Sequence, residues 1–128
     1  MIKNYYFLIA GVLALIGTIG HVYVGHKSIL TEIDKLDVRH AVFLFLHQTT
    51  LFMIVSCIVL FCGALGIIKW NINVGAWMIF AVFGGNFLVH VIYSSVMNKN
   101  ALDQIIPQLI FTLLYLGTIY MGIHKSAN

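Results

Sequence analysis

The chain has 128 residues, of which 61% are hydrophobic and 9% are charged, whereas a soluble domain carries about 25% charged residues. A chain this apolar, with a mean hydropathy of +0.99, has too little polar surface to cover a water-facing globule, so lipid should be its main solvent. The formal charge of +3 comes from Lys and Arg residues scattered singly, without the basic run of a nucleic-acid-binding protein, so we expect no nucleic acid among its partners.

Four apolar segments follow one another, and we expect each to cross the bilayer as an α-helix. They cover residues 5–24, about 38–68, about 74–97 and about 102–123. A spanning helix needs about 20 apolar residues, so the first segment exceeds the apolar core of a cleaved signal peptide and should remain as a membrane helix. Only α-helices and closed β-barrels satisfy the backbone hydrogen bonds of a chain that crosses lipid, and four segments cannot close a barrel. The sequence predicts one all-α domain over residues 1–128, an antiparallel bundle of four transmembrane helices.

Short polar turns at residues 69–73 and 98–100 should make successive helices antiparallel neighbours. The one long connection, residues 25–37, carries apolar side chains at roughly helical spacing: Ile29, Leu30, Ile33 and Leu36. This spacing predicts a short helix lying on the membrane surface.

The cations leave the orientation of the chain nearly balanced. The side that holds the N-terminus, called side A, has three of them: Lys3, Lys69 and Lys125. The opposite side, side B, has four cations and all four acids: Lys27, Lys35, Arg39, Lys99, Glu32, Asp34, Asp37 and Asp103. Because the net positive charge lies on side A, we expect the N-terminus in the cytoplasm.

The histidines gather at one end of the predicted bundle. Five of the six fall in the half near side B, namely His21, His26, His40, His47 and His90, and only His124 is on side A. Ionisable residues within a membrane are costly and usually face a bundle interior or a cavity. Small or polar residues share a helix face with His21 (Ala10, Ala14 and Gly17) and with His90 (Asn86 and Tyr93), and the last segment has a polar face of its own. That face holds Gln104, Gln108, Thr112 and Tyr115, and all three faces are predicted to lie inside the bundle.

Imidazoles converging from several helices indicate a metal or haem site. His21, His47 and His90 come from three helices and could hold copper, zinc or iron, with Gln108 of the fourth orienting a ligand. His26 and His40, with the acids of side B, could form a mouth or a second, shallower metal site.

Haem b is the alternative cofactor, because it needs two axial histidines facing each other across a bundle. His90 could pair with His47 or with His21, and Asn86, Tyr93 and Gln104 would then position the ligands. The chain has no HExxH, no CxxC and no paired membrane carboxylates, so the common metalloprotease and di-iron signatures are missing.

Two other classes of function fit the same residues. The polar faces could line a small carrier or channel, which histidine would make pH-sensitive. They could instead hold helices together in a structural or partner-binding subunit, because a lone membrane histidine is more often an interhelical hydrogen-bonding partner than a ligand. A homo-oligomer, such as a dimer, is compatible with each of these functions.

Three short patches carry a resemblance to a known group of proteins. They are Gly20-His21 through Gly25, Leu46-His47 and Pro107-Gln108. Together they resemble a pattern in small bacterial four-helix membrane proteins of unassigned function, many of which have Trp where this chain has Leu46. The resemblance implies a four-helix membrane fold and, with the brevity of the chain, a prokaryotic inner membrane. It implies no activity.

Overall fold

The computed structural model describes residues 2–68, 71–97 and 102–127, without the side chains of residues 26, 28, 94, 97, 102–105 and 127. Within these residues the long helices are α1 (Tyr5–Val24), α3 (Leu36–Leu65), α4 (Ile72–Met97) and α5 (Leu102–Ala127). Each contains an apolar stretch long enough to cross a bilayer, so the described chain holds four membrane spans. The predicted all-α membrane bundle is confirmed, and the protein is an integral membrane protein.

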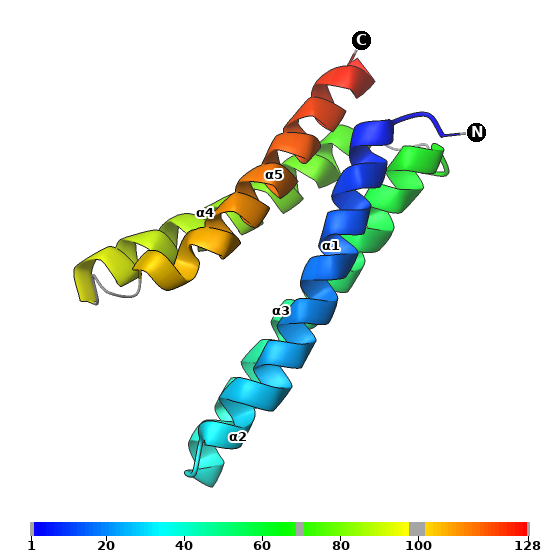
Figure 1. Ribbon diagram of the computed structural model, residues 1–128. Coiled ribbons are helices and arrows are strands. Elements are labelled where there is room, and N and C mark those ends of the chain that lie inside the picture. Colours follow the sequence, from blue (N-terminus) through cyan, green and yellow to red (C-terminus); the bar gives the residue numbers. More distant parts are fainter. Residues whose placement is uncertain (1, 69–70, 98–101, 128) are drawn as a thin grey trace.

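The four helices form two antiparallel hairpins, α1 with α3 and α4 with α5 (Figure 1). The hairpins converge at the end that holds both chain termini, which is side A, and diverge towards the end that holds the short helix α2 (Leu30–Glu32), which is side B. The bundle is therefore closed in one half and splayed in the other.

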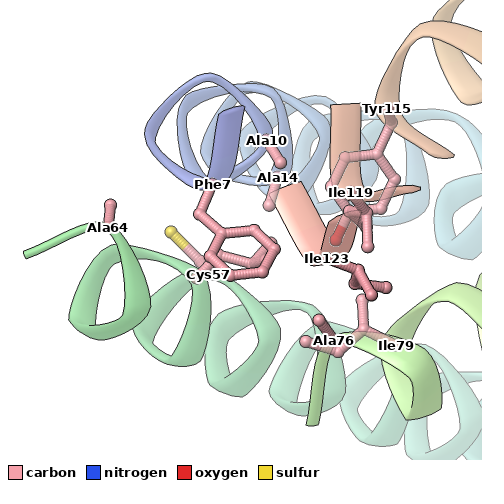
Figure 2. Close-up of a cluster of buried hydrophobic side chains, with 11 residues drawn as sticks. Phe7, Ala10, Ala14, Cys57, Ala64, Ala76, Ile79, Tyr115, Ile119 and Ile123 are labelled. Carbon is pink, nitrogen blue, oxygen red and sulfur yellow. The ribbon is translucent and has the colours of Figure 1, made fainter. Parts of the chain in front are cut away.

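All four spans contribute to one core (Figure 2), and its members come from the side A half of each span. Its buried members are Phe7, Ala10, Ala14, Cys57, Leu60, Ala64, Ala76, Ile79, Tyr115, Ile119 and Ile123. Several are alanines, and small residues let membrane helices approach closely, so that dispersion contacts replace the hydrophobic drive that is absent in lipid. Ala10 and Ala14 confirm the interior position expected for the first half of their stripe.

The connection after α1 continues that helix and does not form the separate surface helix expected there. A five-residue π-helical turn, η1 (Gly25–Ile29), leads directly into α2 (Leu30–Glu32), and Ile33 then becomes extended. The expectation fails because residues 25–32 contain no helix breaker: Gly25 keeps right-handed helical dihedrals. It packs so closely on Leu46 of α3 that a Cβ at residue 25 would lie 3.3 Å from that side chain.

A glycine cap ends α3 at Leu65, before the expected end at residue 68. Gly66 has φ 66°, and the Ile67 amide donates to the carbonyl of Cys62 at 2.9 Å, which together make a Schellman motif. The Ala64 carbonyl also accepts hydrogen bonds from the backbone amides of Lys3 and Asn4, at 2.8 and 3.2 Å. The end of α3 therefore holds the chain leading into α1.

Substituting alanine for Gly66 should lower the free energy of unfolding by about 1–2 kcal/mol, because an L-residue is strained in the left-handed conformation. The new Cβ would also meet the side chain of Lys3. Titration of sodium dodecyl sulfate into dodecylmaltoside micelles, followed by far-ultraviolet circular dichroism, measures the change. Gly20→Ala is the matched control, since Gly20 is helical with open space at its Cβ and should lose no stability. Equal destabilisation of both variants would contradict the cap.

Candidate functional site

Aromatic contacts mark the depth at which the two hairpins still touch. Phe52 of α3 and Phe83 of α4 have ring centroids 5.5 Å apart. His47 lies five residues beyond Phe52 towards side B, and His90 lies seven residues beyond Phe83 in the same direction. At a rise of about 1.5 Å per residue, these histidines are about 7 and 10 Å past the contact along their helices. They occupy similar depths on opposite hairpins.

A second contact, between α1 and α5, shows that the remaining candidate ligands, His21 and Gln108, lie at a similar distance from the level at which the hairpins touch. A Cβ on Gly17 would lie 3.2 Å from the ring of Phe111. His21 is four residues past Gly17 towards side B, and Gln108 is three residues past Phe111. These intervals correspond to about 6 and 4.5 Å. The four candidate residues thus belong to a layer within about two helical turns of the level at which the hairpins separate.

Sharing a layer does not bring the side chains together. His40, His47, His90, Gln108, Asn86 and Tyr93 are exposed on the chain, and His21 is half-buried. Within residues 2–68, 71–97 and 102–127, no group of three or more His, Cys, Asp or Glu side chains is close enough to hold a metal ion. The splay of the hairpins separates the polar faces that were expected to line a common interior. The side chains of His26 and Gln104 lie outside the described residues.

His21 has a buried ring nitrogen. Its Nε2 atom is buried and has no hydrogen-bond partner among the described residues. Leaving such an atom without a partner costs about 1–3 kcal/mol, which a ligand to that nitrogen would recover. His21 follows Ala14 and Gly17 on the face through which α1 approaches the other helices. His21 therefore lies one helical turn towards side B from the Gly17–Phe111 contact between the hairpins.

His47 is oriented by its own helix. Its Nδ1 atom lies 3.0 Å from the carbonyl oxygen of Phe43, and its ring stacks on that phenylalanine with centroids 4.0 Å apart. A carbonyl oxygen can only accept, so Nδ1 carries the hydrogen and donates it. In the neutral ring Nε2 then carries the lone pair, which is the tautomer typical of histidine ligands fixed by a backbone carbonyl.

The opposite end of the molecule carries a polar group that sequence reasoning did not assemble. Tyr6 of α1 and Tyr120, Met121, His124 and Lys125 of α5 line an open depression of about 540 Å³. The sequence placed His124 on side A, apart from the other histidines, and did not bring Tyr6 near it. The available signal was the spacing of Tyr120 and His124, four residues apart at the end of the last span.

Comparison of the chain with protein families, curated sequences and solved structures finds no significant match.

Proposed function

We propose that this integral membrane protein carries haem b between its two hairpins, with His90 as one axial ligand and His21 or His47 as the other. The single observation that carries the proposal is the buried Nε2 of His21, which has no hydrogen-bond partner among the described residues and lies one helical turn past the Gly17–Phe111 contact between the hairpins. Hydrogen-bonding partners for a buried imidazole are scarce in lipid, so a coordinating ion is a physically suitable partner.

The separation of the hairpins favours haem over an isolated metal ion. A single transition-metal ion needs about three protein ligands converging on one point. Haem b needs only two imidazoles on opposite sides of a flat ring, and His47 and His90 lie at similar depths on opposite hairpins. The hydrogen bond from His47 Nδ1 to Phe43 supports the role of Nε2 as a ligand. Bound haem would supply one-electron transfer, and the protein would contribute ligand orientation and a water-poor setting.

An absorption spectrum and elemental analysis of the protein purified in detergent without chelator test this function. A Soret band with near-stoichiometric iron is expected. Copper or zinc without a Soret band would favour a metal site formed by His21, His47 and His90 and would overturn the haem assignment. A colourless, metal-free protein that also fails to take up added haemin would overturn both.

Substitution of His90 by alanine should reduce the haem content at least tenfold, because one axial ligand is removed. His124→Ala is the matched control, since it removes an imidazole from the end of α5 on side A and should leave the spectrum unchanged. Circular dichroism should be the same for both variants, since both side chains are exposed. Full haem content in the His90→Ala, His21→Ala double variant would contradict the proposal.

The second candidate function is a partner-binding subunit, with a second copy of the chain or another membrane helix on α4. It rests on the exposure of α4: only 11% of its most apolar stretch is buried, against 28% in each other span. Asn86 and His90 are exposed on this helix, and lipid cannot satisfy such groups. An Asn86→Leu variant that weakens a detergent-resistant oligomer, with no spectral change, would support this candidate.

We propose that the N-terminus is cytoplasmic, as the net positive charge of side A indicates. The brevity of the chain and its resemblance to small bacterial membrane proteins support a prokaryotic inner membrane as its location. Cysteine labelling from either side of the membrane tests this orientation.

A further inference from the structure

The depression on side A lies between the first turn of α1 and the last turns of α5. Its lining residues are Tyr6, Tyr120, Met121, His124 and Lys125, and its volume is about 540 Å³. It lies at the ends of two membrane spans, which is the level of lipid headgroups. It is remote from the histidines of side B, because the core residues of α1 and α5 lie between the two regions along these helices.

Aromatic rings hold a cation at the edge of this depression. The Lys125 Nζ lies 5.4 Å from the ring centroid of Tyr5 and 5.8 Å from that of Tyr6. Tyr120 packs edge-on against the His124 imidazole, with centroids 4.4 Å apart. The two contacts limit the freedom of the ammonium and the imidazole, so less entropy is lost when either group binds an anion.

The charge around the depression is positive. All four acids of the chain lie towards side B: Glu32, Asp34, Asp37 and Asp103. Lys3 and Lys125 are the described cations of side A. No described side-chain carboxylate therefore competes for Lys125 at this end. An anion near Lys125 is attracted by the combined positive charge of side A.

We propose that the depression binds the phosphate headgroup of an anionic phospholipid. Lys125 and His124 would contact the phosphate, and the hydroxyls of Tyr6 and Tyr120 could donate hydrogen bonds to headgroup oxygens. Basic pockets between transmembrane helices at the cytoplasmic surface bind such headgroups.

The surroundings favour a lipid over free phosphate as the source of that group. Apolar side chains continue from the depression into the membrane at helical spacing. Ile9 follows Tyr6, and Leu113 and Leu114 precede Tyr120 and Met121 by seven residues, all exposed. These exposed side chains offer apolar surface to acyl chains, which free phosphate lacks.

Native mass spectrometry of the protein in micelles doped with equal amounts of phosphatidylglycerol and phosphatidylcholine tests the proposal. Preferential retention of phosphatidylglycerol is expected. Lys125→Ala should reduce that retention about fivefold, since each basic residue near an anionic membrane surface strengthens binding by about that factor. Lys125→Arg should restore it.

Lys3→Ala is the matched control, because it removes the same charge from the same side without touching the depression. It should retain most phosphatidylglycerol binding. Equal losses in the Lys3 and Lys125 variants, or no preference for phosphatidylglycerol in the wild type, would overturn the proposal. Complete displacement of the lipid by millimolar inorganic phosphate would also overturn it, by identifying free phosphate as the ligand.

Discussion

Substitution of Phe7 by alanine should lower the free energy of unfolding by about 2–4 kcal/mol. The Phe7 ring is fully buried at the point where α1 meets α3 and α5. A Cβ on Gly63 of α3 would lie 3.2 Å from this ring, and a Cβ on Gly122 of α5 would overlap it. The loss is mostly dispersion energy, because the unfolded reference state in a micelle still offers the ring an apolar solvent. Titration with sodium dodecyl sulfate followed by circular dichroism measures it.

Phe45→Ala is the matched control for this substitution. Phe45 lies on α3 with 70% of its side chain exposed, so the same truncation there should change stability by less than about 0.5 kcal/mol. Gly122→Ala should destabilise the native chain but cost much less in the Phe7→Ala background, where the added methyl enters the vacated space. Additive effects in this double-mutant cycle would show that the ring and the glycine do not contact each other.

The contact of the Phe7 ring with glycine is an example of what the sequence could not predict about the fold. Hydropathy and short turns predict four antiparallel spans because lipid forces every apolar segment into a helix. They do not predict where the hairpins close. Part of the packing that closes them is the Phe7 ring of one hairpin against Gly122 of the other, and Gly122 does not differ in hydropathy from Gly20 and Gly85, which have open space at their Cβ positions.

For the candidate site, too, the sequence predicts one property of the residues and misses another: it predicts their depth along the helices but not the direction in which they face. Counting residues along helices predicts the depth of His47 and His90, because the rise per residue is fixed. Depth does not determine which way a helix face points. Asn86 and His90 were expected to face an interior, yet they are exposed because α4 leans away from α3 in this half. The tilt between hairpins depends on tertiary packing at the far end of the molecule.

Replacement of Asn4 by alanine should destabilise the protein by about 2–3 kcal/mol. The Asn4 Oδ1 caps α1 by accepting from the amides of Tyr6 and Phe7, at 3.1 and 3.2 Å. Its Nδ2 donates to the carbonyl oxygen of Gly122 and to the Ser126 hydroxyl, both at 2.8 Å. One buried side chain thus joins the start of α1 to the end of α5, and its removal leaves the amides of Tyr6 and Phe7 without their cap and breaks the link to α5.

Asn4→Ser separates these two roles, since serine is an equally good cap but cannot donate to α5 through an amide. Its stability should fall between those of the wild type and Asn4→Ala, as measured by thermal unfolding in detergent. Ser126→Ala, which removes only one acceptor, should cost less than about 1 kcal/mol. If Asn4→Ser is as stable as the wild type, the bond to α5 contributes nothing. An intermediate value would show that the bond from Asn4 to α5 contributes to stability. Because this bond joins the two helix ends that line the depression, we expect both Asn4 variants to weaken phosphatidylglycerol retention in that same order.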